Sequence, residues 1–166
     1  MDIIKILQQE FHQESGITRK MLALVPQDKY DWKPHEKSMT MLQLATHIAE
    51  IPSWIGMGLH TEGIDFASFA YTPTPIANND ALLALFEKNV ADGLLQLEGT
   101  TTAALNGTWI MRAGDHIIAE MSKYDTIRHA YSQIIHHRAQ LGVYLRLLDI
   151  PIPGTYGPSA DDQGGF

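Results

Sequence analysis

Apolar residues recur every three or four positions in four stretches of the chain, which is the spacing of helices that bury one face. These stretches cover residues 2–25, 40–62, 79–97 and 122–148. Residues that can cap a helix stand where two of the patterns begin, since Thr40 with Gln43 can form a capping box and Ser122 can cap the last helix. Pro26 and Gly99 stand where the first and third patterns end. The pattern therefore predicts four amphipathic helices.

Other features interrupt or connect these helices. Pro52 lies inside the second stretch, where it removes one backbone hydrogen bond and is expected to bend the helix. Residues 63–78 contain prolines and small residues, which predicts a long crossover loop. Two short apolar runs flank residues 113–115 and indicate a β-hairpin over residues 109–120. Residues 150–166 are rich in proline and glycine, so we expect an extended and partly mobile tail.

The predicted elements favour one fold class. Each amphipathic helix needs a partner for its apolar face, and two short strands are too few to build a sheet-based core. We therefore expect an all-α protein, a four-helix bundle that forms a single domain over residues 1–166. Its second and third helices should be joined by the long crossover, and the small hairpin should precede the fourth helix.

Composition narrows the function classes. The chain has no cysteine, which excludes disulfides, thiolate metal sites and a cysteine nucleophile. Its formal net charge is −7 and its basic residues are scattered, so direct nucleic-acid binding is disfavoured. We find no signal-peptide pattern and no run approaching the roughly 18 apolar residues of a membrane span. We expect a cytoplasmic protein without a membrane partner.

Histidines and one glutamine carry the candidate chemistry. Gln133 and His137 stand four positions apart on one face of the fourth helix, so their Cβ atoms should lie about 5–6 Å apart. His47 lies at the edge of the apolar stripe of the second helix, where it can face the bundle interior. Donors on facing helices can hold one metal ion. Hydrogen-bonded histidines at a helix interface give the same pattern, and the spacing alone does not separate the two interpretations.

Several blocks of sequence carry a family resemblance. Residues 136–146 read HHRAQLGVYLR, residues 151–161 read PIPGTYGPSAD, residues 32–34 read WKP and residues 44–48 read LATHI. Together these blocks strongly resemble the DinB-like (damage-inducible) family over nearly the whole chain. The resemblance implies a four-helix bundle, often a homodimer, with a metal ion held by three histidines. One of these comes from the second helix and two, spaced i and i+4, come from the last. Relatives include thiol-dependent S-transferases.

Carried over to this chain, the resemblance makes His47 and His137 metal ligands and places the third ligand at Gln133. The resemblance makes zinc or nickel the expected ion, and an amide oxygen is a weaker donor to either than imidazole is. Gln133 can ligate directly, orient a metal-bound water, or mark a degenerate site that binds metal weakly or not at all. His129 lies about 12 Å along the helix from His137, so we expect it to be structural or to support a ligand.

Other polar residues receive weaker assignments. Glu14 and Thr18 interrupt the apolar stripe of the first helix, where Glu14 could hydrogen-bond a ligand imidazole, although ordinary solvent exposure is the more common case. His136 and Arg138 are expected to be surface or dimer contacts. Tyr144 is expected in the core.

Two functions follow as hypotheses. The first is a metal-dependent enzyme, a thiol S-transferase or hydrolase that acts on a small molecule, because a bound divalent ion lowers the pKa of a thiol or of water. No catalytic residue can be assigned. The second is a non-catalytic dimeric bundle, related to stress or to sensing metal or small molecules, with a degenerate site. A direct role on DNA is supported only by the name of the family.

Overall fold

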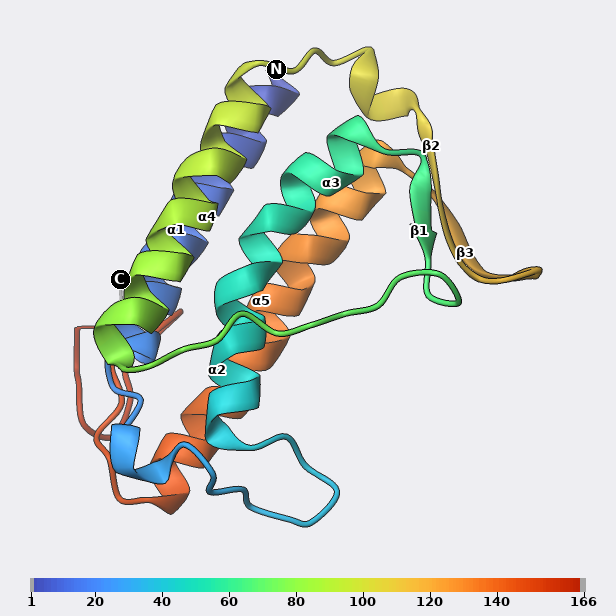
Figure 1. The fold of residues 1–166 in the computed structure, drawn as a ribbon. Coiled ribbons are helices and arrows are strands. Elements are labelled where there is room, and N and C mark those ends of the chain that lie inside the picture. Colours follow the sequence, from blue (N-terminus) through green and yellow to red (C-terminus); the bar gives the residue numbers. More distant parts are fainter. Residues whose placement is uncertain (1, 165–166) are drawn as a thin grey trace.

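The computed structural model describes residues 2–164, which are mostly helical with a small three-stranded sheet (Figure 1). The helices and strands are α1 (Ile3–Leu22), α2 (Met41–Glu50), α3 (Trp54–His60), β1 (Gly63–Asp65), α4 (Asn79–Glu98), β2 (Thr108–Ala113), β3 (His116–Ser122) and α5 (Lys123–Leu147). Among the described residues, no helix is both long enough and apolar enough to cross a membrane.

The predicted cap residues hold the helix ends. Thr40 and Gln43 form the capping box at the start of α2, in which each side chain bonds the other's backbone N–H. Ser122 accepts a hydrogen bond from the backbone N–H of Asp125 at the start of α5. Gly99 is the C-cap of α4. These local signals therefore fix where α2 and α5 begin and where α4 ends.

Pro52 divides the second predicted helix into two. The segment Ile51–Ser53 is a turn of 3₁₀ helix between α2 and α3, because proline has no N–H to continue the α-helical pattern. The apolar residues on both sides remain buried, and Ile48, Ile51 and Ile55 are fully inaccessible to solvent. The 3₁₀ turn begins four residues after His47, at the place where the sequence predicts a bend.

The helices pack in neighbouring pairs. α1 contacts α4 and α5, and α2 with α3 contacts the same two helices on their other side. In Figure 1, α1 and α5 run in one direction and α2, α3 and α4 run in the other. The chain between α3 and α4 therefore has to return along the length of the molecule, and it passes in front of α2 and α5.

Two clusters of buried apolar residues form the core. One lies around Leu44, Phe86 and Leu141, and it includes Tyr144, as expected. The other surrounds Phe11 and Tyr131, whose rings stack with centroids 5.4 Å apart. Both clusters contain residues from α1, α4, α5 and the segment from α2 to α3. Apolar packing therefore holds this segment against α5 along its length.

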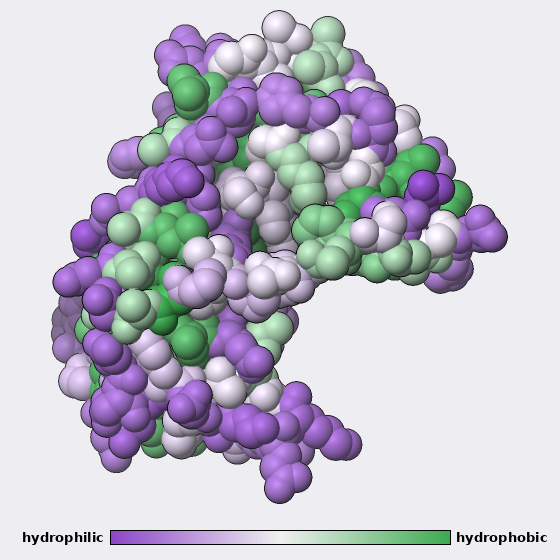
Figure 2. All heavy atoms as spheres, viewed as in Figure 1, coloured by the Kyte–Doolittle hydropathy of each residue, from purple (hydrophilic) through white to green (hydrophobic). Residues whose placement is uncertain are grey.

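The small sheet has the order β1–β2–β3. β2 and β3 pair antiparallel on either side of Gly114 and Asp115, and Gly114 has a φ of 60° that favours glycine. β1 pairs with β2 in parallel. The sequence predicts a loop over all of residues 63–78, but the first three of these residues form β1. Figure 2 shows that hydrophobic side chains gather over the sheet and that the surface is hollowed below it.

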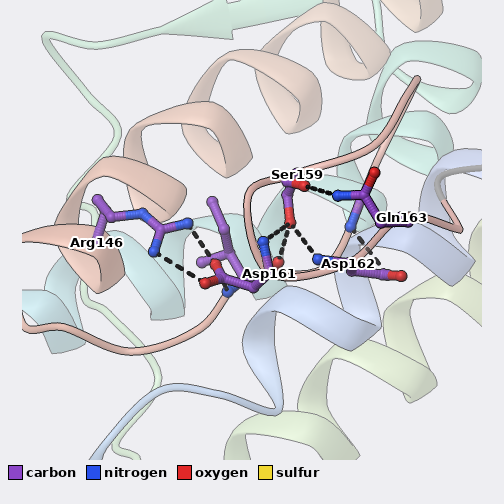
Figure 3. A network of polar contacts seen from close by, with 7 residues as sticks. Arg146, Ser159, Asp161, Asp162 and Gln163 are labelled. Carbon is purple, nitrogen blue, oxygen red and sulfur yellow. Dashed lines mark hydrogen bonds and ion pairs between the residues drawn. The ribbon is translucent and has the colours of Figure 1, made fainter.

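The tail differs from the extended segment that its composition predicts. Residues 150–164 fold back beside α5, where Arg146 forms an ion pair with Asp161. Asp161 also accepts a hydrogen bond from the backbone N–H of Ile152, and Ser159 donates to the carbonyl of Ile152 at 2.6 Å. Figure 3 shows this network, in which Asp162 lies beside Ser159. Carboxylates and a hydroxyl thus supply the hydrogen bonds that a helix or sheet would supply elsewhere.

Candidate metal centre

His47 and His137 face each other across the α2–α5 contact. His47 of α2 lies between the buried residues Leu44 and Ile51 in the chain, and His137 lies between Ile134 and Leu141 on α5. Their ring centroids are 4.7 Å apart and their planes are inclined by 80°. The packing of apolar neighbours therefore brings two imidazoles from separate helices to one point.

Both imidazoles are held in the neutral form. Burial lowers the pKa of His47, the nearby His137 lowers it further, and Glu50 partly opposes the shift. Burial also lowers the pKa of His137, while a hydrogen bond from its ring to Gln140 opposes the shift. A pKa below the ordinary value of about 6.5 leaves each ring uncharged at neutral pH, with a nitrogen lone pair available to a metal ion.

Gln140 selects the tautomer of His137. Nδ1 of His137 lies 2.8 Å from Oε1 of Gln140, and because a carbonyl oxygen only accepts, Nδ1 carries the proton. The remaining ring nitrogen, Nε2, then has the free lone pair. Metal-binding histidines are commonly oriented in this way. Sequence reasoning did not assign this role to Gln140, although its position one turn after His137 is a signal that could have found it.

The third predicted ligand lies on the same helix but makes a different contact. Nε2 of Gln133 lies 3.4 Å from Nε2 of His129. His129 in turn lies parallel to Trp54, with ring centroids 6.4 Å apart, and Trp54 contacts His47 edge-on at 5.6 Å. Sequence reasoning did not identify Trp54, which is the first residue of α3.

Within residues 2–164, no group of three or more His, Cys, Asp or Glu side chains is arranged to hold a metal ion. The donor set on offer is therefore two imidazoles and one amide. His136 is exposed on α5, as expected, with its ring 4.9 Å from that of His137.

Glu50 attaches the segment between β1 and α4 to the helix that carries His47. Its two carboxylate oxygens accept hydrogen bonds from the Tyr71 hydroxyl at 2.6 Å and from the backbone and hydroxyl of Thr74 at 2.9 and 2.7 Å. Burial and the adjacent carboxylate raise the pKa of Tyr71, so its hydroxyl stays protonated and continues to donate. Glu50 lies one turn after His47, so this segment is fixed close to the candidate centre.

Glu14 and Arg138 do not take the positions expected of them. Arg138 is 2% exposed and Glu14 is 5% exposed, so neither is a surface residue. Arg138 donates to the Glu14 carboxylate at 2.6 Å and to the hydroxyls of Thr18 at 3.1 Å and Tyr156 at 2.8 Å. Tyr156 also donates to Glu14 at 2.7 Å. Glu14 therefore neutralises a buried guanidinium and supports no ligand imidazole.

The chain belongs to the DinB family, whose sequence model matches residues 4–164. No curated protein sequence matches it significantly.

Solved structures share the fold at low sequence identity. A DinB-like protein from Bacillus cereus is 18% identical, with a TM-score of 0.70 over 90% of this chain and 95% of its own. A DinB-like protein from Bacillus subtilis is 19% identical, with a TM-score of 0.67 over 89% and 94%. A mycothiol-dependent maleylpyruvate isomerase is 17% identical, with a TM-score of 0.61 over 84% of this chain and 60% of that one.

Proposed function

We propose that this DinB-family protein binds one divalent metal ion, zinc or nickel, between α2 and α5, with His47 and His137 as ligands. The observation that carries the proposal is the convergence of the two rings, whose centroids are 4.7 Å apart although they come from separate helices. Both rings are kept neutral by burial, and Gln140 leaves Nε2 of His137 free. Gln133 is the remaining candidate donor.

The chemistry that we propose is transfer of a low-molecular-weight thiol to an electrophilic small molecule, or a hydrolysis. A divalent ion at this centre would supply Lewis acidity that lowers the pKa of a thiol or a water. The protein itself would orient the imidazoles through Gln140 and wall the site with the segment that Glu50 holds. The shared fold with a mycothiol-dependent isomerase supports a thiol as co-substrate.

A non-catalytic role is the second candidate, and the presence of glutamine at position 133 favours it. Residue 133 carries an amide where the family resemblance places an imidazole, and a neutral amide oxygen is a weak donor to zinc or nickel. In this case the protein would be a helical module with a degenerate site.

Metal analysis of protein purified without an affinity tag tests the first proposal. We expect close to one equivalent of divalent metal in the unaltered protein and none in His137→Ala. Gln133→His should raise the affinity, because imidazole replaces the weaker donor. His12→Ala on the exposed side of α1 is the matched control and should retain the metal. Unchanged metal content in His137→Ala would show that the ligand assignment is wrong. Unaltered protein that carries little or no metal, and that shows no activity in a screen of thiols against electrophiles, would favour the second candidate.

The finer assignments belong to the same proposal. We propose that the fold is a four-helix bundle, with a long crossover between its second and third helices and a β-hairpin before the fourth. We also propose that the protein is a cytoplasmic homodimer. Light scattering during size-exclusion chromatography measures the oligomeric state directly, and a monomer at micromolar concentration would contradict the dimer.

A further inference from the structure

The two ends of the Gln133 amide differ in what they can bind. The amide oxygen has lone pairs that a metal ion or its water can use, whereas the amide nitrogen only donates hydrogen bonds. Gln133 can therefore serve the proposed centre only if its oxygen end faces His47 and His137. An amide that is free to turn over would present the wrong end part of the time.

A contact on the same helix fixes this orientation. Gln133 stands on α5 one turn after His129 and one turn before His137. The amide nitrogen lies 3.4 Å from Nε2 of His129, which must accept the hydrogen bond because the amide nitrogen can only donate. The nitrogen end of the amide is thus turned towards His129. The amide oxygen takes no part in this contact and keeps its lone pairs for a metal ion or its water.

Trp54 restrains the ring of His129 from a second element. The two rings are nearly parallel, with an interplanar angle of 9° and centroids 6.4 Å apart. Trp54 also contacts His47 edge-on at 5.6 Å, and His47 contacts His137 at 4.7 Å. Trp54 therefore links His129, the residue that contacts Gln133, to His47 in the candidate centre.

We infer that His129 is a positioning residue that presents the amide oxygen of Gln133 to the ion proposed at His47 and His137. This inference rests on the proposed function, since it assigns a role within the same site. It gives a centre with two imidazole nitrogens and one neutral amide oxygen as donors. Groups that orient a metal ligand typically change metal affinity by about 10- to 100-fold when they are removed.

The first test replaces His129 with phenylalanine, which keeps an aromatic ring beside Trp54 and removes the accepting nitrogen. We expect Zn²⁺ affinity, measured by competition with a chromophoric chelator, to fall about tenfold. His12→Phe introduces the same change on the exposed side of α1 and should leave the affinity unaltered. Circular dichroism of the metal-free proteins verifies the fold.

The second test repeats the substitution in a Gln133→His background. An imidazole at position 133 needs no amide to be oriented, so His129→Phe should then change Zn²⁺ affinity by no more than about twofold. Equal losses in the two backgrounds would show that His129 acts through packing alone and would overturn the inference. The same comparison is made with His129→Leu if the phenylalanine variant does not fold.

Failure of the inference and failure of the proposed function give different results. An unaltered protein that binds no Zn²⁺ overturns the proposed function. A protein that needs His137 for Zn²⁺ but tolerates His129→Phe overturns only the role of His129. In the unaltered protein, the ¹⁵N side-chain amide signals of Gln133 should shift when Zn²⁺ is added. Amide signals that do not move, in a protein that binds Zn²⁺, would also overturn the inference.

Discussion

The guanidinium of Arg138 is charged and almost fully buried, so the stability of the fold depends on the groups that compensate this charge. Glu14 supplies the opposite charge, and the hydroxyls of Thr18 and Tyr156 accept further hydrogen bonds. Removing one member of a buried ion pair leaves the other charge without compensation and costs about 3–5 kcal/mol. We therefore expect Glu14→Ala to lower the free energy of unfolding by about this amount in urea titrations.

An exposed ion pair serves as a control that separates the effect of burial on stability from the effect of removing a charge. Arg19 and Glu87 also form an ion pair, but about half of each side chain is exposed. Exposed pairs contribute about 0–1 kcal/mol, so Glu87→Ala should have a small effect. Equal losses from Glu87→Ala and Glu14→Ala would contradict the argument.

The lowered pKa values of His47 and His137 make the stability of the metal-free protein depend on pH. In the unfolded chain these rings take up protons near their ordinary pKa of about 6.5, whereas the folded protein resists protonation until the pH is lower. The unfolded state therefore binds more protons below about pH 6.5, and stability falls as the pH drops through the lowered pKa values. Urea unfolding at a series of pH values measures this loss. A variant with glutamine at both positions should lose less stability, and an unchanged pH dependence would exclude these rings as its source.

Residue-scale roles were only partly predictable. Sequence reasoning could place His47 and His137 on helix faces, and the family resemblance singled them out. It could not show that Arg138 is buried, because its partners come from α1 and from the tail. Long charged side chains are usually exposed, so the local pattern favoured the wrong environment.

At the scale of elements, the segment between β1 and α4 is held near the candidate centre by one carboxylate. Glu50 accepts all three hydrogen bonds from Tyr71 and Thr74 described above. Hydrogen bonds to a charged group contribute about 1.5–3 kcal/mol. We expect Glu50→Ala to accelerate hydrogen exchange at the Thr74 amide by about tenfold or more and to open residues 66–78 to proteolysis.

Tyr71→Phe is a control that removes only part of the attachment to Glu50. It removes one of the three hydrogen bonds and leaves both bonds from Thr74, so exchange at the Thr74 amide should rise less than in Glu50→Ala. A segment equally protected in all three proteins would show that Glu50 does not hold it.

Elements with local signals were predictable, and elements with distant partners were not. The caps at Thr40 and Ser122 and the helix irregularity at Pro52 follow from neighbouring residues, so the sequence analysis located them. β1 was missed because its partner is β2, more than 40 residues away in the chain. The folded tail was missed for a different reason, since its hydrogen bonds come from Arg146 and from carboxylates within a proline-rich segment, and these follow no helix or strand periodicity.

At the scale of the whole molecule, the candidate centre joins two helices that lie far apart in the sequence. His47 belongs to α2 and His137 to α5, and both helices contribute to each core cluster, directly or through the continuation of α2 beyond Glu50. The convergence of the two rings is thus a property of the assembled helices. Spacing along α5 could suggest a donor pair, but the packing of α2 against α5 was needed to bring His47 to it.

This arrangement predicts that metal binding stabilises the entire fold. In the unfolded chain His47 and His137 are separated by about 90 residues and do not form a common site, so the ion binds the folded state preferentially. At a free Zn²⁺ concentration 100 times the dissociation constant, the free energy of unfolding should rise by about 2.7 kcal/mol. For a chain of this size such a gain raises the melting temperature by several degrees, which calorimetry can measure. His47→Ala should abolish the Zn²⁺-dependent increase, whereas His60→Ala, which alters an exposed histidine in α3, should retain it. An increase that survives in His47→Ala would mean that Zn²⁺ stabilises the protein from a different site.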